Sequence, residues 1–463
     1  MTARTDDVDA TTPATFMQGM DERTWRPAHT RILLALGLGW MLDAFEVTLV
    51  GNVLPILRHV WSLGALESTL TISLWLAGIL VGALAFGWLA DRFGRRRLFL
   101  MTLVLYAVAT FLTAFSINFW MFLVLRVIAA IGVGAEYSAV NAAVAELMPA
   151  RWRGRAAALV MSFWPVGALL GGGLTLGVLA VAPPEIAWRI VFGGGAFVAL
   201  FALWARRSLP ESPRWLMSRG REKEAADAYA RIAGAQAVTQ LRSETQTRPV
   251  ARHWLAEFGI LWRKYPARLA LGAVLDISEA GGYYGLFALI PLAIVPALHL
   301  NFAGTPLFYL VGGIGALAGA LVAAWLLEQV GRKATVTGFY IAAALAMILI
   351  AAALVVGSGA TLAAYVLASA VGTGSWVAAY PAFAEIFPTR SRATGIGASV
   401  AAGRVAAGLS PPLLVFIAGR YSVTAALVTA GLFYLIGVAA MLPWIIHGPE
   451  ARGRTLESLA GPE

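Results

Sequence analysis

The chain has 463 residues, of which 59% are hydrophobic and only 13% charged, and its mean hydropathy is +0.74. Soluble domains carry about 25% charged residues, so these values exclude a soluble enzyme and predict an all-α integral membrane protein. The sequence contains no cysteine, which excludes disulfides, thiol catalysis and cysteine metal sites.

Apolar stretches long enough to cross a bilayer as a helix, about 20 residues, occur twelve times. The predicted spans are 31–57, 66–90, 98–116, 119–147, 155–180, 187–207, 267–297, 306–328, 333–356, 361–386, 393–419 and 422–446. Glycines four residues apart within a span indicate close packing between helices. Such pairs are Gly78/Gly82, Gly167/Gly171 and Gly315/Gly319.

The distribution of Lys and Arg predicts the orientation, because cytoplasmic loops are enriched in both. Thirty of the 35 lie in the termini and in the loops predicted on the same side, whereas three (Arg58, Arg189 and Arg420) lie on the other side. Both termini are therefore predicted in the cytoplasm, and the net charge of +10 reflects topology rather than nucleic-acid binding. We recognise no signal peptide. The expected parts are an N-terminal arm (1–30), a six-helix bundle (31–207), a cytoplasmic linker (208–266), a second six-helix bundle (267–446) and a tail (447–463).

The two halves repeat each other in sequence. Residues 87–96 match 324–333 at an offset of 237, and residues 145–153 match 384–392 at an offset of 239. Parallel repeats with a site at the midplane between them are typical of transporters. We expect the charged loop residues to latch the cytoplasmic helix ends in one state of an alternating-access cycle. The predicted latch comprises Gly87, Asp91, Arg92, Gly94, Arg95, Glu146, Arg153, Glu211, Arg214, Glu328, Arg332, Glu385 and Arg392.

These motifs resemble those of a known superfamily. The loop at 87–96, with its second copy, resembles the major facilitator superfamily, and the run Pro-Glu-Ser-Pro-Arg-Trp-Leu at 210–216 is similar to sugar porters and organic ion transporters. Shorter motifs resemble the bacterial niacin-transporter branch, whose members are metabolite:proton symporters. These motifs are Arg126 with 132–136, 153–155 with 162–164, 283–285 with Pro291, and 403–404. The resemblance implies the major facilitator fold, with twelve transmembrane helices in two pseudo-symmetric six-helix bundles.

Seven charged residues lie inside predicted spans away from the span ends, where each costs at least about 2.5–3.5 kcal/mol and is a functional candidate. We predict that Asp43 and Arg126 couple the proton, because a change in their separation would alter the proton affinity of the carboxylate. Proton-linked sugar porters are similar in placing an Asp in span one and an Arg in span four. A static ion pair is the alternative interpretation. Glu136 and Glu46 are secondary candidates for proton carriers.

Arg404 lies near the middle of span eleven, where a guanidinium suits bidentate capture of a carboxylate. The resemblance to organic anion carriers implies the same role, whereas pairing of Arg404 with Asp276 or Glu279 is the alternative. Aromatic residues near these charges would suit a small planar ring. The predicted substrate site comprises Arg404, Trp164, Tyr284, Trp376, Tyr283, Tyr380, Asp276, Glu279, Trp75 and Asn141.

We therefore expect a monomeric secondary transporter of the inner membrane that imports a small organic acid with protons, nicotinate being the leading candidate. An organic-cation or drug/proton antiporter is the nearest alternative, because five acids and two bases lie in the spans away from their ends. A sugar:proton symporter is disfavoured because the spans contain no Gln and few Asn. A non-transporting sensor is a further alternative. No phosphate loop or metal motif is recognised, so we predict no enzyme activity, cofactor, metal or nucleic-acid partner.

Overall fold

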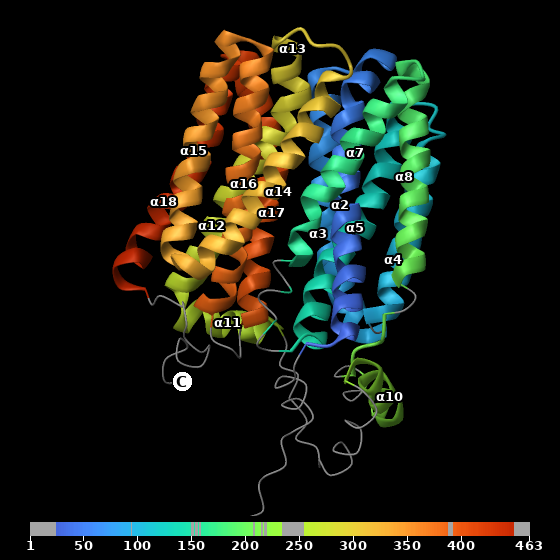
Figure 1. Cartoon of the computed structure of the whole chain (residues 1–463), viewed down its shortest axis with the longest axis vertical. Coiled ribbons are helices and arrows are strands. Elements are labelled where there is room, and N and C mark those ends of the chain that lie inside the picture. Colours follow the sequence, from blue (N-terminus) through green and yellow to red (C-terminus); the bar gives the residue numbers. More distant parts are fainter. Residues whose placement is uncertain are drawn as a thin grey trace, which may run out of the picture.

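The computed structural model describes residues 25–93, 95–149, 152, 156, 159–206, 209–213, 216, 220–233, 254–387 and 392–448. All regular secondary structure within these ranges is helical (Figure 1). Each of the twelve predicted spans coincides with a helix. Among the described helices, nine are long and apolar enough to cross a membrane. The expectation of an all-α membrane protein is confirmed.

In the described part of the first half of the chain, six long helices pack against one another. They are α2 (Pro27–Val60), α3 (Ala65–Phe93), α4 (Arg95–Thr113), α5 (Phe119–Leu147), α7 (Phe163–Leu179) and α8 (Pro184–Arg206). In this bundle α2 packs on α7 and α8, while α5 packs on α3 and α4. The turn before α5 is fixed locally, because the Asn118 side chain accepts a hydrogen bond of 2.9 Å from the Met121 amide and so caps the helix.

The second half repeats this arrangement. Its helices are α12 (Pro266–Leu289), α14 (Gly304–Gln329), α15 (Arg332–Val356), α16 (Ser358–Ile386), α17 (Arg392–Arg420) and α18 (Val423–His447). Here α12 packs on α17 and α18, and α16 packs on α14 and α15. Between the halves lie α10 (Glu222–Ala233) and α11 (Trp254–Lys264), at the end of the molecule where α2 begins (Figure 1). We call this the α11 end.

The span predicted at 267–297 is not one uniform helix. After α12 the chain forms a π-helical turn, η4 (Ile290–Ile294), and a short helix, α13 (Val295–Ala297). Pro291 lies in the first turn of this segment and has no amide hydrogen to donate, which explains why the regular pattern changes here. The segment lies at the opposite end of the molecule from α11, which we call the α13 end (Figure 1).

Glycines bring helices of the same bundle into backbone contact. A Cβ added at Gly82 of α3 would overlap the carbonyl oxygen of Ile131 in α5, and a Cβ at Gly319 of α14 would overlap that of Ala370 in α16. The two glycines are 237 residues apart and their partners 239, the offsets of the sequence repeat. The predicted glycine packing is therefore confirmed at these crossings, and the repeat extends to the three-dimensional contacts.

The two bundles meet along two seams, where α7 packs on α14 and α3 on α17. A Cβ at Gly172 would lie 2.9 Å from the Leu310 Cβ, and one at Gly313 would lie 2.9 Å from the Leu169 Cγ. At Gly172 the Leu310 backbone nitrogen is equally near, at 2.9 Å, whereas at Gly313 the nearest atoms belong to the Leu169 side chain. The candidate site lies between the bundles at mid-depth.

Candidate functional site

A buried ion pair links α2 and α5 inside the first bundle. The guanidinium of Arg126 contacts the carboxylate of Glu46, and neither side chain has any exposed surface. Thr110 of α4 donates a hydrogen bond of 3.1 Å to Glu46 and accepts one of 3.4 Å from Arg126. The Phe192 ring of α8 lies 5.0 Å from the guanidinium carbon. Helices α2, α4, α5 and α8 thus converge on one charged pair.

In this conformation Arg126 pairs with Glu46, and the coupling of Arg126 with Asp43 stays a prediction. Asp43 is 1% exposed, but the ion pair that Arg126 makes within the described part of the chain goes to Glu46. The physical reason is depth. Helix α5 begins at the end where α2 finishes, and Glu46 lies about 4.5 Å nearer to that end than Asp43. Glu46 also has the longer side chain. The two acids therefore have different surroundings, although they lie on one helix face.

A small cavity lies between the bundles and contains most of the predicted substrate site. Its volume is about 20 Å³, which is enough for about one water molecule. The lining residues are Trp164, Asp276, Glu279, Ala280, Tyr283, Tyr284, Trp376, Tyr380 and Arg404. We call it the central cavity. Residues from α7, α12, α16 and α17 meet there. Trp75 is buried but does not line it, and the side chain of Asn141 lies outside those the structure describes.

Arg404 lies beside two carboxylates in this cavity. Its Nη1 donates a hydrogen bond of 3.0 Å to the Tyr284 hydroxyl, and its positive charge acts on both Asp276 and Glu279. A Cβ at Gly403 would overlap a carboxylate oxygen of Asp276. Gly403 therefore lets the acid of α12 approach the backbone of α17 next to the guanidinium. The predicted alternative, in which Arg404 interacts with these acids, agrees with this proximity.

Aromatic rings form the wall between the bundles. Trp40 of α2 stacks on Trp376 of α16 at 6.2 Å with an interplanar angle of 8°. Trp164 meets Trp376 edge-on at 5.9 Å, and its Nε1 donates a hydrogen bond of 3.1 Å to the Tyr283 hydroxyl. Trp40 was absent from the predicted site. Its position three residues before Asp43, on the same helix face, is the signal that could have identified it.

Most of the predicted latch, and one proton candidate, lie outside the described side chains. This group comprises Gly87, Asp91, Arg92, Gly94, Arg95, Glu136, Glu146, Arg153, Arg214, Glu385 and Arg392. Glu211, Glu328 and Arg332 are described, and Arg332 donates a hydrogen bond of 3.1 Å to the Leu327 carbonyl. The latch stays a prediction. Within the described ranges, no cluster of three or more His, Asp or Glu side chains is placed to hold a metal ion.

Comparison with known proteins identifies relatives along nearly the whole chain. The model of the family described as "Sugar (and other) transporter" matches residues 25–460. The niacin transporter NiaP of Acinetobacter baylyi is 31% identical over 432 residues, which cover 93% of this chain and 96% of the relative. A Bacillus subtilis protein that carries the provisional name niacin/nicotinamide transporter NiaP is 28% identical over 437 residues, which cover 93% of this chain and 99% of that relative.

The fold is similar to that of a solved sugar transporter. The structure of the proton:xylose symporter XylE of E. coli, bound to 6-bromo-6-deoxy-D-glucose, gives a TM-score of 0.73 at 22% sequence identity. The alignment covers 93% of this chain and 98% of that chain. At this identity the likeness concerns the fold, which is that of the major facilitator superfamily.

Proposed function

The chain belongs to the sugar (and other) transporter family of the major facilitator superfamily, and we propose that it imports a small aromatic monocarboxylate, such as nicotinate, together with a proton. It is a multi-pass membrane transporter of small molecules and not an enzyme. The observation that carries the finer proposal is the central cavity, where one guanidinium lies among five aromatic side chains. The niacin transporter among its relatives supports the same solute class.

Arg404 is the proposed anchor for the solute's carboxylate. Its planar guanidinium can donate two parallel hydrogen bonds to a carboxylate, and Tyr284 already holds it in place. The rings of Trp164, Trp376 and Tyr283 would stack on or abut a planar heterocycle. None of the described residues that line this cavity is Asn or Gln, whereas a polyol solute needs several neutral donors and acceptors. The lining therefore favours an aromatic acid over a sugar.

The carboxylates around the cavity are the proposed proton carriers. Asp276 and Glu279 are 2% and 6% exposed and compete with an incoming anion for the charge of Arg404. Protonation of one of them would remove that competition, so proton and anion binding would favour each other. In the first bundle, Asp43, Glu46 and Arg126 are the proposed coupling group, with Glu136 as a further candidate. A shift of Arg126 from Glu46 toward Asp43 would change the proton affinity of both acids.

The central cavity is closed around about one water molecule in this conformation. A pyridine carboxylate needs more room, because ligand pockets usually have volumes of several hundred Å³. Entry of the solute therefore requires the contacts of Trp376 with Trp40 and Trp164 to break. An alternating-access cycle would separate these residues. We propose an inner-membrane location, a monomer and cytoplasmic termini at the α11 end, on the 30-to-3 distribution of Lys and Arg.

A second candidate function is transport of an organic cation. Among the described lining residues of the central cavity are two carboxylates and one guanidinium, so these groups together are negative when both acids are ionised. Under this hypothesis Arg404 would keep the acids in place and would not touch the solute. The two functions predict opposite effects of removing Arg404, because a cation would bind more tightly without it.

Uptake into proteoliposomes tests these proposals. We would measure radiolabelled nicotinate and N-methylnicotinamide, a cation of similar shape, with and without an inward proton gradient. We expect gradient-dependent nicotinate accumulation, and its loss in Arg404→Ala. Arg420→Ala, at the far end of the same helix, is the matched control. Accumulation of the cation by the wild type, retained or increased in Arg404→Ala, would overturn the anion proposal.

A further inference from the structure

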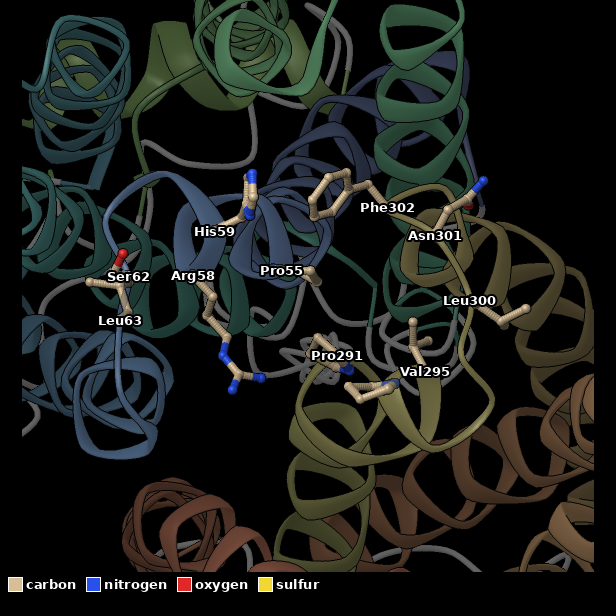
Figure 2. A pocket seen from close by; sticks show the side chains of 11 residues that line it. Pro55, Arg58, His59, Ser62, Leu63, Pro291, Val295, Leu300, Asn301 and Phe302 are labelled. Carbon is tan, nitrogen blue, oxygen red and sulfur yellow. The ribbon is translucent and has the colours of Figure 1, made fainter.

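A second and much larger cavity lies at the α13 end of the molecule. Its volume is about 610 Å³, within the usual range for small-molecule sites. The lining residues are Pro55, Arg58, His59, Ser62, Leu63, Pro291, Val295, Pro296, Leu300, Asn301 and Phe302. We call it the outer cavity. One wall is the end of α2 and the other is η4, α13 and the loop after them, so the cavity is shared by the two bundles (Figure 2).

The outer cavity has a positive charge that is not balanced locally. Arg58 is half-buried in the last turn of α2, and its guanidinium extends from α2 toward the side where Pro291 lies (Figure 2). The structure gives this guanidinium no hydrogen bond or ion pair with any described residue. No carboxylate is among the described residues that line the cavity. A partly desolvated, unpaired guanidinium is a strong attractant for an anion.

The remaining lining suits a small ring that bears a carboxylate. His59 is the other ionisable residue, and its ring lies 5.7 Å from that of Phe302. Ser62 and Asn301 are exposed and offer neutral hydrogen-bonding groups. Pro55, Pro291 and Pro296 restrict the backbone of both walls, so the cavity is largely preformed.

An aromatic pair packs α12 against α14 at a position on α12 between lining residues of the two cavities. Phe287 and Tyr309 stack at 4.6 Å with an interplanar angle of 16°, and the Tyr309 hydroxyl donates a hydrogen bond of 2.8 Å to the Phe287 carbonyl. A Cβ at Gly51 of α2 would lie 2.7 Å from the Tyr309 ring. Along α12 and η4, Phe287 lies between Tyr284 of the central cavity and Pro291 of the outer one. The two cavities are therefore lined at successive positions along α12 and η4, with Phe287 between these positions.

We infer that the outer cavity is a separate binding site for small carboxylate anions, in which Arg58 supplies the charge and from which the solute passes to the central cavity. The passage of the solute rests on the proposed function. The anion site itself does not, because it follows from the cavity and the unpaired guanidinium. It differs from the central site in being wide, polar at its rim and positively charged.

The absence of cysteine from the chain allows a direct test of charge in this cavity. In Ser62→Cys, the rate of modification by the anionic sulfonatoethyl methanethiosulfonate is compared with that by the cationic trimethylammonium reagent. A guanidinium that lines the same cavity should favour the anionic reagent about five- to tenfold. Adding Arg58→Gln should abolish this preference, whereas adding Arg420→Gln, which removes a charge elsewhere at the same end, should not. Asn301→Cys is the second reporter, on the opposite wall.

Benzoate, a plain aromatic carboxylate, serves as the ligand probe. Benzoate should slow the modification of Ser62→Cys when this is the only substitution and when Arg404→Ala is added. It should not slow the modification when Arg58→Gln is added. A charge preference that survives Arg58→Gln at both reporters, or no protection by benzoate, would overturn the anion site. Failure of nicotinate uptake with intact protection would instead refute the proposed function alone, because modification reports occupancy and not flux.

Discussion

The ion pair between Glu46 and Arg126 gives the sharpest quantitative prediction. Removing one partner of a buried pair leaves an uncompensated charge and costs about 3–5 kcal/mol. Both side chains are fully buried. We therefore expect Arg126→Met or Glu46→Leu to lower the free energy of unfolding by this amount. The loss of a hydrogen-bond partner at Thr110 adds about 1 kcal/mol. The double variant should recover most of the loss, because apolar side chains then replace both charges.

Unfolding by SDS in mixed micelles, followed by tryptophan fluorescence, measures the four free energies of this cycle. A second double-mutant cycle, with Asp43→Leu and Arg126→Met, serves as the matched control, because Asp43 lies one helical turn before Glu46. We expect a coupling energy of several kcal/mol for Glu46 and less than about 1 kcal/mol for Asp43. A larger coupling with Asp43 would refute the pairing described above and restore the one predicted from the sequence.

Three further predictions concern packing, the aromatic wall and the latch. Gly319→Ala should destabilise the protein by about 1–3 kcal/mol, because its methyl group would overlap a backbone carbonyl of α16; Gly338→Ala, which meets open space, should be neutral or stabilising in the same unfolding assay. Trp164→Phe should lose the hydrogen bond to Tyr283, worth about 1 kcal/mol, and raise the KM for nicotinate uptake, whereas an unchanged KM would remove this contact from the site. Asp91→Asn should slow transport in correctly folded protein, and unchanged uptake rates would refute the latch.

The sequence predicted the scaffold well because its signals are local. Apolar stretches of sufficient length located the long helices of both halves, though not α10 or α11, and the repeat offset located equivalent crossings such as those of Gly82 and Gly319. Membership of the major facilitator superfamily, predicted from the loop motif, is confirmed. Eight of the ten residues predicted for the substrate site line one cavity, although their contact with a solute stays a prediction.

Features that depend on packing between distant segments were not predictable in the same way. The choice of Glu46 over Asp43 depends on the relative depth of two helices that are 80 residues apart in sequence. Trp40 joins the aromatic wall only because α16 places Trp376 opposite it. The outer cavity is formed by two segments about 235 residues apart, and no pattern within either segment indicates a cavity.

The glycine crossings imply which parts of the molecule are stiff and which can slide. Within each half, helices touch backbone to backbone at Gly82 and Gly319, and such crossings leave no rotatable bonds to absorb a displacement. At the seam between α7 and α14, Gly172 approaches the Leu310 backbone, but Gly313 meets the Leu169 side chain, whose rotamer can change as one surface moves past the other. We therefore expect each half to move as a rigid body, with the relative motion taking place at the seam between α7 and α14.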